Sequence, residues 1–221
     1  MCIRDRDMID TVIFDLDGTL LYTLENLHLS TNYALDKYGF KQRTLKEIRS
    51  FVGNGVELLI KRAVPDDTDE ITTAKCLADF KEHYAATMYD KTRPYDGIVE
   101  MLDKLNADNI KCAVVSNKFD AAVKELCERY FGKRILYAVG ERDGIRKKPA
   151  PDSVLEVIRQ IGGKNCVYVG DSEVDIQTAQ NAGIPCISVS WGYKDKDYLQ
   201  MQGAELIAGD VASLLNCLYK I

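Results

Sequence analysis

TVIFDLDGTLL, residues 11–21, runs from an apolar segment typical of a buried strand directly into Asp15 and Asp17. Residues two apart in a strand point the same way, so both carboxylates leave one face at the end of this strand. Burying two carboxylates this close together is costly unless a positive charge offsets their repulsion. Gly18 allows a sharp turn after the pair, and Thr19 offers a hydroxyl to orient a neighbouring carboxylate. A positive group facing this strand end would offset that cost.

The size and charge of the chain limit the classes of protein to which it can belong. Its 221 residues suffice for one large domain, or for one domain that carries a smaller insert. A net charge of −5 provides no basic surface for nucleic acid. No apolar run approaches the roughly 20 residues of a membrane span, and the N-terminus lacks the apolar core of a signal peptide. Residues 1–8 are expected to form a polar tail outside the fold.

The cysteines and histidines indicate the cell compartment and the kind of metal that the chain could bind. Seven cysteines are scattered without a CxxC pair, which favours a reducing cytoplasm over a disulfide framework. Only two histidines are present, so a histidine-rich zinc site is not expected. A metal bound by this chain should be a hard cation with oxygen ligands.

Short apolar runs rich in β-branched residues alternate with helical patterns along most of the chain. Strands that are apolar on both faces and alternate with helices predict a parallel sheet covered by helices on both sides. The fold class is therefore α/β, with a doubly wound, Rossmann-like core. The predicted strands are 11–14, 112–116, 135–139, 166–170 and 184–190, and the helical patterns between the later ones are 120–131, 152–162 and 175–183.

The interval between the first two strands breaks this alternation, because about 90 residues pass before the strand at 112. Apolar residues in that interval recur at spacings of three and four, which is typical of helices. We interpret the interval as an α-helical cap domain, residues 22–92, inserted into a core domain of residues 1–21 and 93–221. The helical patterns in the interval are 24–39, 44–52, 55–64 and 72–89.

A second acidic pair, Asp171 and Asp175, follows the predicted strand 166–170. Open parallel sheets bind ligands at the carboxyl ends of their strands. Two acidic strand ends that meet in space would form an oxygen-lined site suited to Mg²⁺. Each acidic pair taken alone could equally be a solvated turn or a helix cap.

Two other segments carry polar side chains in positions where they could hold phosphate. Ser116 and Asn117 end the strand at 112–116, where the serine hydroxyl and the asparagine backbone N–H can donate to phosphate oxygens. Lys148 stands directly before Pro149 in RKKPAPD, in a rigid and non-helical turn. Taken alone, the first segment could be a helix N-cap and the second a surface loop with a solvated lysine.

Together these segments resemble the signature set of the haloacid dehalogenase superfamily of phosphohydrolases. DLDGTL, SNK, KPAPD and GDSEVDIQTAQNAG stand in the expected order at strand ends, and the resemblance extends from about Thr11 to Leu215. It implies that Asp15 attacks phosphorus to form an aspartyl phosphate. It also implies that Asp17 acts first as general acid and then as general base, roles that need different protonation states.

The same resemblance implies a metal site and a phosphate site. Mg²⁺ would be bound by Asp15, the backbone carbonyl of Asp17 and Asp171, with Asp175 supporting it through water. The phosphoryl oxygens would be neutralised by Ser116, the Asn117 N–H and Lys148. A dehalogenase would need neither the second acid nor the metal, so these residues favour a phosphatase.

Within the predicted cap, RSFVGNGVELLIKRA, residues 49–63, looks like the substrate loop of the phosphoglycolate phosphatase group. Gly53 and Gly55 around Asn54 suit a tight loop whose amides can approach a small anion, or else an ordinary helix–helix turn. Arg49 could supply charge for a substrate carboxylate, or could be a solvated helix residue. The chain departs from that group at Tyr22, where aspartate or asparagine is common.

The sequence thus predicts a Mg²⁺-dependent phosphatase in the cytoplasm that acts on a small phosphorylated metabolite, with 2-phosphoglycolate as the favoured substrate. Alternatives of the same fold are an inorganic pyrophosphatase, a sugar-phosphate phosphatase and a β-phosphoglucomutase. An alternative of another class is an anion-binding regulatory module without catalysis. No nucleic acid or membrane partner is expected, and the chain could be a monomer or a homodimer.

Overall fold

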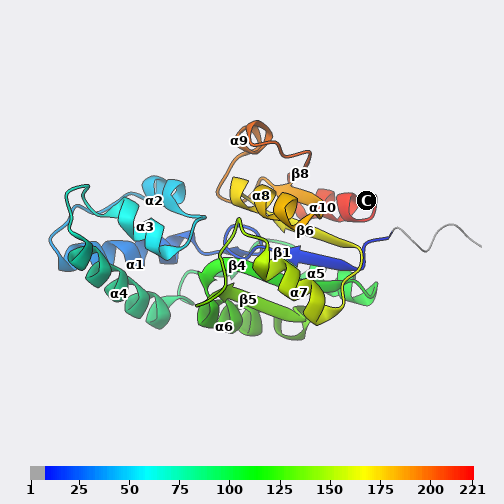
Figure 1. The fold of residues 1–221 in the computed structure, drawn as a ribbon, viewed down its shortest axis with the longest axis horizontal. Helices are drawn as coiled ribbons and strands as arrows, with labels where there is room; N and C mark the ends of the chain where they lie inside the picture. The colour runs from blue at the N-terminus through cyan, green and yellow to red at the C-terminus, as the bar shows by residue number, and fades with distance from the viewer. Residues whose placement is uncertain (1–7) are drawn as a thin grey trace, which may run out of the picture.

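The computed structural model describes residues 8–221, and its centre is a six-stranded sheet (Figure 1). The strand order is β5-β4-β1-β6-β7-β8, and every pair of neighbours runs parallel. The predicted α/β core with a doubly wound parallel sheet is confirmed. The expected tail at residues 1–8 lies outside the described residues, apart from Met8. The strands of the sheet are β1 (Thr11–Phe14), β4 (Lys111–Phe119), β5 (Tyr137–Glu141), β6 (Cys166–Gly170), β7 (Cys186–Val189) and β8 (Leu206–Ala208).

Strand β1 lies inside the sheet at the point where the order of the strands reverses. β4 and β5 follow on one side of it, and β6, β7 and β8 on the other. Residues 11–14 pair with 111–114 of β4 and with 166–169 of β6. Such a reversal opens a crevice at the carboxyl ends of the strands. The residues that follow β1 and β6 are therefore brought together with the end of β4.

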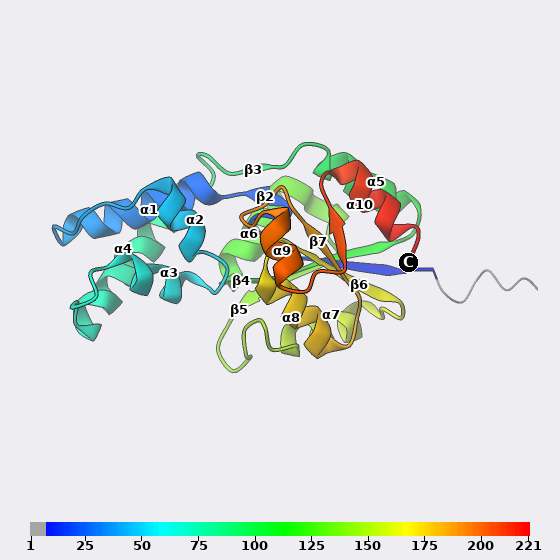
Figure 2. The ribbon, with the colours of Figure 1, turned by 90° about the horizontal axis from the view of Figure 1, so that it is seen from above.

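Helices cover both faces of the sheet (Figure 2). Val12 and Phe14 point into one apolar core, and Ile13 points into the other, as the alternation of side chains along a strand requires. The first core is closed by α5 (Ile98–Ala107), α6 (Asp120–Phe131) and α10 (Val211–Leu218), and the second by α7 (Asp152–Ile161) and α8 (Glu173–Ala182). A short 3-10 helix (Gly132–Arg134) follows α6, and α9 (Lys196–Met201) lies between β7 and β8.

Four helices between β1 and α5 form a separate group at the left of Figure 1, in which α1 packs along α4. The chain enters and leaves the group through a short antiparallel pair of strands. These two strands lie beside the predicted limits of the cap, and the division into a core (1–21 and 93–221) and a cap (22–92) stays a prediction. The elements are α1 (Leu24–Lys37), α2 (Leu45–Phe51), α3 (Val56–Ala63), α4 (Glu70–Thr87), β2 (Leu21–Tyr22) and β3 (Arg93–Pro94).

Several peripheral elements differ from the sequence-based expectation. β5 covers 137–141 instead of 135–139, and β7 covers 186–189 instead of 184–190. The sequence did not predict β2, β3 and β8, because strands of two or three residues carry no periodic pattern and exist through their pairing. It also assigned no helix to α5, α9 or α10.

Six cysteines among the described residues carry free thiols. None of the helices in residues 8–221 has both the length and the apolar character of a membrane span.

Candidate active site

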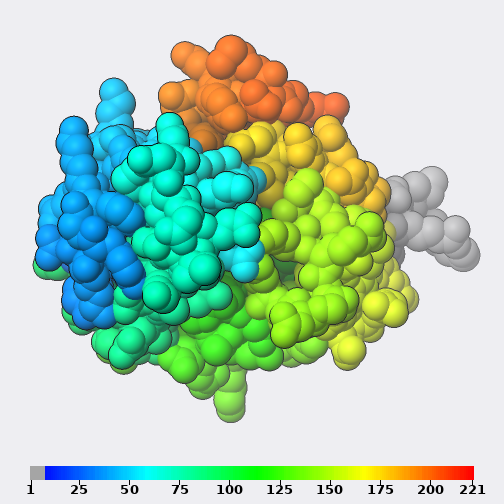
Figure 3. Space-filling view, turned by 60° about the vertical axis from the view of Figure 1, so that its left-hand side comes forward, coloured from blue at the N-terminus to red at the C-terminus, as the bar shows by residue number. Residues whose placement is uncertain are grey.

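The ends of three neighbouring strands meet at a small cavity under the helices of the predicted cap. Asp15 follows β1, Ser116 lies near the end of β4, and Asp171 follows β6. The cavity has a volume of about 50 Å³. Figure 3 shows the segment that contains these helices lying directly against the core. The cavity is lined by Asp15, Asp17, Leu27, Val52, Gly53, Gly55, Val56, Leu59, Ser116, Asn117, Lys118, Lys148, Asp171, Ser172, Tyr193 and Lys194.

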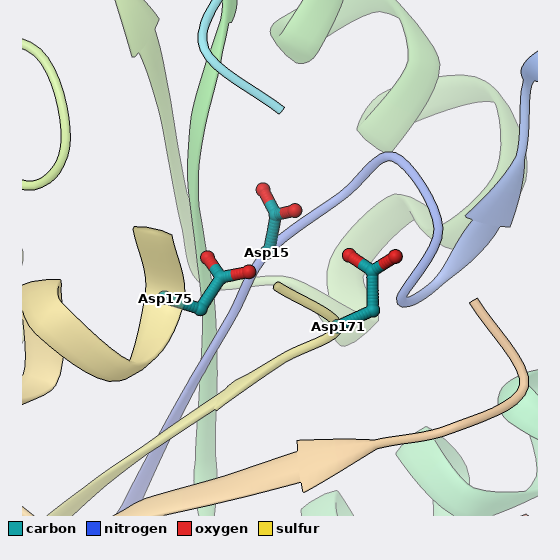
Figure 4. A group of neighbouring side chains, drawn as sticks. All are labelled: Asp15, Asp171 and Asp175. Atoms are coloured by element: carbon teal, nitrogen blue, oxygen red, sulfur yellow. The ribbon is translucent and has the colours of Figure 1, made fainter. Parts of the chain in front are cut away.

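Three buried carboxylates gather on the core side of the cavity (Figure 4). Asp15, Asp171 and Asp175 each offer an oxygen atom within 4.8 Å of those of the other two. Burial raises the pKa of the Asp15 carboxyl from 3.8 to about 7, against the opposing attraction of Lys148. Burial and the charges of Asp175 and Asp15 raise the pKa of Asp171 well above its usual value. The group is therefore short of positive charge, as the sequence predicted for a cation site.

The side chain of Lys148 supplies part of that charge. Its Nζ donates to Asp15 Oδ1 at 2.8 Å, to Asp175 Oδ1 at 2.7 Å and to the Tyr168 hydroxyl at 3.0 Å. Burial lowers the pKa of Lys148, but the two carboxylates outweigh this effect and hold the pKa well above its usual value. Lys148 is thus a buried ammonium, stabilised by its two carboxylate partners, beside the proposed nucleophile.

Asn117 holds the backbone of Lys148 in place. Its Oδ1 accepts from the Lys148 backbone N–H at 2.8 Å, and its Nδ2 donates to the Lys148 carbonyl at 3.1 Å. The Asn117 side chain is therefore occupied in the protein, which leaves the backbone N–H for the phosphate role that the sequence predicts. Ser116 Oγ accepts the Lys118 N–H at 3.2 Å, so its own hydroxyl proton stays available to a ligand.

The donor set fits a hard cation. Both oxygens of Asp175 are engaged, Oδ1 by Lys148 and Oδ2 by the backbone N–H and hydroxyl of Ser172. No hydrogen bond from residues 8–221 reaches Asp15 Oδ2 or Asp171 Oδ1, so each of these two carboxylates keeps one oxygen free. Two free carboxylate oxygens in a buried acidic group match the ligands that Mg²⁺ prefers. This pattern favours Asp15 and Asp171 as direct ligands, with Asp175 acting indirectly.

Two glycines allow the backbone to approach Asp171 closely. A Cβ atom at Gly18 or at Gly192 would come within 2.4 Å of Asp171 Oδ2. Gly18 also has a φ of +88°, which larger residues rarely adopt. The Gly18 that the sequence singled out for its turn is therefore also needed to make room for a candidate metal ligand.

The structure adds residues around Asp17 that the sequence did not predict. Lys118 Nζ donates to both carboxylate oxygens of Asp17, at 3.0 and 3.1 Å, and lies 4.4 Å from the centre of the Tyr84 ring in α4. Thr23 Oγ1 donates to Asp17 Oδ1 at 2.6 Å. Lys118 directly follows Asn117 at the end of β4, so the same strand-end rule that singled out Ser116 and Asn117 could have included it.

Thr19 does not orient a carboxylate, contrary to the expectation from the sequence. Its hydroxyl is buried without a hydrogen-bond partner among the described residues, and its carbonyl accepts from Trp191 Nε1 at 3.1 Å. The hydroxyl that contacts Asp17 comes from Thr23, at the start of α1. The chain turns at Thr19 and then passes through β2, which brings Thr23, rather than Thr19, beside the carboxylate.

Only part of the predicted substrate loop lines the cavity. Gly53 and Gly55 line the cavity, whereas Asn54 lies outside the lining and accepts from Arg62 at 3.3 Å. Arg49 lies outside it too and contacts the core. Tyr22, at the departure from the family pattern, packs edge to face on Tyr95. A role of these residues in substrate binding stays a prediction.

The raised pKa of Asp15 predicts how the stability of the metal-free protein depends on pH. Between pH 4 and 7 the folded state keeps a proton that the unfolded state releases, so the free energy of unfolding decreases as pH rises. The Asp15→Asn variant has no carboxyl group at this position, so it does not take up this proton. In EDTA, the stability of the variant relative to the wild type should therefore increase over this range, by up to about 4 kcal/mol. Urea unfolding of both proteins at several pH values measures the difference, and a constant difference would contradict the prediction.

Comparison with known proteins places this site in a family. A model of haloacid dehalogenase-like hydrolases matches residues 12–189. The chain belongs to this family of hydrolases. Within the family it is a phosphoric monoester hydrolase, because its similarity to phosphatases covers nearly the whole chain.

The relatives share both sequence and fold with this chain. A phosphoglycolate phosphatase of Agrobacterium fabrum is 33% identical over 221 residues, which cover 97% of this chain and 94% of the relative. One of Mesorhizobium japonicum is 32% identical and covers 89% of each chain. A crystal structure from Lactobacillus delbrueckii subsp. bulgaricus, provisionally named a phosphoglycolate phosphatase, is 34% identical, with a TM-score of 0.92 over 97% of this chain and all of the other.

Proposed function

We propose that this chain is a Mg²⁺-dependent phosphatase that hydrolyses 2-phosphoglycolate, or a similarly small phosphorylated metabolite, through an aspartyl phosphate on Asp15. One observation carries the proposal. The free oxygen of Asp15 lies at a small cavity beside the buried ammonium of Lys148, and a free oxygen of Asp171 completes a cation site there. A nucleophile, a charge for the phosphoryl group and a metal site thus meet at one point.

In the first step, an oxygen of the Asp15 carboxylate attacks phosphorus, a bond from this oxygen to phosphorus forms, and the bond to the leaving oxygen breaks. Asp17 gives its proton to the leaving oxygen, which departs as an alcohol. The hydroxyl of Ser116, the backbone N–H of Asn117 and the ammonium of Lys148 stabilise the charge on the phosphoryl oxygens. Lys148 is already held beside Asp15 before substrate binds, so little reorganisation is needed.

In the second step, Asp17 acts as the base. It takes a proton from a water molecule whose oxygen attacks phosphorus, and the bond between phosphorus and Asp15 breaks. Inorganic phosphate leaves and the Asp15 carboxylate is restored. Lys118 and Thr23 both donate to the Asp17 carboxylate, which keeps this side chain at the cavity through both steps.

The metal would be held by Asp15, Asp171 and the backbone carbonyl of Asp17, with Asp175 contributing through water. When bound, Mg²⁺ would supply the positive charge that the buried carboxylates lack and would help to neutralise the phosphoryl group. Asp175 serves the site in a second way, because it fixes the ammonium of Lys148.

The shape of the cavity supports a small substrate. Its cap side is apolar, being formed by the buried side chains of Leu27, Val52, Val56 and Leu59. This apolar side presses close to the carboxylates of the core, which favours a substrate with a short carbon chain. The relatives named phosphoglycolate phosphatase point to the same substrate.

The first experiment measures phosphate release from 2-phosphoglycolate, pyrophosphate, hexose phosphates and nucleoside monophosphates, with Mg²⁺ and again with EDTA. We expect release that requires Mg²⁺ and is concentrated on 2-phosphoglycolate. Preference for pyrophosphate or a hexose phosphate would support the corresponding alternative enzyme. Absence of release from every compound would favour the anion-binding module. Location in the cytoplasm and the choice between monomer and homodimer stay predictions.

A further inference from the structure

Arg49, which the sequence suggested for a substrate carboxylate, contacts the core instead. From helix α2 its Nε donates to the Tyr193 carbonyl at 2.7 Å, and its Nη2 donates to the Gly192 carbonyl at 3.0 Å. Figures 1 and 2 show α2 facing the loop that leads from β7 to α9. The planar guanidinium thus spans two successive carbonyls of one loop, as its fork of donors allows.

The same loop orients a candidate metal ligand. The Tyr193 N–H donates to Asp171 Oδ2 at 2.6 Å, and Gly192 allows the close approach to this carboxylate. The Gly192 carbonyl and the Tyr193 N–H belong to one peptide unit. Because that unit is planar and its two groups point in opposite directions, a bond that fixes the carbonyl also fixes the direction of the N–H.

A single rigid peptide therefore links Arg49 to Asp171. Hydrogen bonds on both sides of one peptide unit polarise it and strengthen each other. Arg49 stays exposed at the surface, so its contact can form and break without unfolding of the core. Through this loop, the contact joins the predicted cap to Asp171, whose Oδ2 accepts from the Tyr193 N–H.

We propose that Arg49 is a positioning residue that couples closure of the cap to metal binding. With α2 against the core, Arg49 holds the Gly192–Tyr193 peptide so that its N–H keeps Asp171 turned toward the cation site. Coupling of two binding events is reciprocal, so Mg²⁺ in turn favours the closed arrangement. The inference rests on the metal site of the proposed function and adds a residue that lies outside the cavity.

The test is a calorimetric titration of the protein with Mg²⁺ in the absence of substrate. We expect Arg49→Met to raise the dissociation constant of Mg²⁺ roughly three- to tenfold, the size expected for one or two partly exposed hydrogen bonds to a charged group. Arg49→Lys should restore part of the affinity, because an ammonium can reach one carbonyl. The matched control is Lys46→Met on the same helix, which removes an equal charge from an exposed side chain with no hydrogen bond or ion pair among the described residues.

A spectroscopic readout follows the loop directly. Trp191, the single tryptophan of the chain, precedes Gly192 and donates to the Thr19 carbonyl. Its fluorescence should change with Mg²⁺, and the midpoint of the change should shift in Arg49→Met but not in Lys46→Met.

An Mg²⁺ dissociation constant of Arg49→Met equal to that of the wild type would overturn the inference. If the wild type still released phosphate in a Mg²⁺-dependent reaction, the proposed function would stand alone. A wild-type protein that binds no Mg²⁺ would overturn the inference together with the metal site. A shifted Mg²⁺ affinity in a protein that releases no phosphate would support the inference and reject the phosphatase.

Discussion

We expect Asp15→Asn to lower the rate of phosphate release by about four to six orders of magnitude, to the limit of detection, because it removes the nucleophile of the first step. Asparagine has nearly the same shape as aspartate and keeps an oxygen for Lys148. Lys148 also keeps its contacts with Asp175 and Tyr168, so the site should stay assembled. The measurement is release of inorganic phosphate under saturating Mg²⁺ and substrate.

The matched control is Asp197→Asn, which makes the same change on the exposed surface of α9 and should leave the rate unchanged. Thermal unfolding of both variants checks that they are folded. A folded Asp15→Asn protein that keeps more than about a tenth of the wild-type rate would rule out an aspartyl phosphate on Asp15. The Mg²⁺-dependent activity would then need a different nucleophile.

Lys148→Met should show the second large effect, on activity and stability together. Loss of the ammonium removes charge from the phosphoryl oxygens and should lower kcat by about a thousandfold. It also leaves Asp15 and Asp175 buried without their shared cation. In EDTA we therefore expect the free energy of unfolding to fall by about 3–5 kcal/mol, the usual result of removing one partner of a buried ion pair.

The neighbouring lysine provides the control for this substitution. Lys147 is partly exposed, pairs with Glu141 and Glu57, and lies outside the lining of the cavity. Lys147→Met should therefore cost at most about 1 kcal/mol of stability and little activity. Mg²⁺ should recover part of the stability lost in Lys148→Met, because a second cation then offsets the same carboxylates. Equal behaviour of the two variants would show that Lys148 is not part of the site.

The sequence predicted the central strands and the residues that follow them with good accuracy. β1, β4 and β6 are apolar runs buried on both faces, so their pattern is local and strong. Asp15, Ser116 and Asp171 follow or end these strands, and the rule for ligand sites in parallel sheets places them together. The structure shows them around one cavity, and their catalytic roles stay part of the proposal.

Elements defined by long-range pairing could not be predicted in the same way. β2 and β3 have two residues each and are separated by some 70 residues of chain, so nothing local distinguishes them from turns. Lys118 lies at the same strand end as Ser116, but its burial and its contact with Asp17 depend on the packing of α4 against the core. In the sequence, Arg49 looks like a solvated helix residue. Its two acceptors lie more than 140 positions away in the chain, so no local pattern indicates them.

The sequence by itself determined the parallel α/β core, the family and the carboxylates at the strand ends, because buried strands and strand-end acids are local patterns of residue type and spacing. Only the tertiary structure decided which of these carboxylates keep an oxygen free for a metal ion. Lys148 and Ser172 engage both oxygens of Asp175, whereas Asp15 and Asp171 each keep one oxygen free. It also decided that Thr23 rather than Thr19 reaches Asp17, and that Arg49 reaches the core. The physical reason is that a hydrogen bond requires a distance and a direction, and residues far apart in the chain acquire both only when the whole molecule packs.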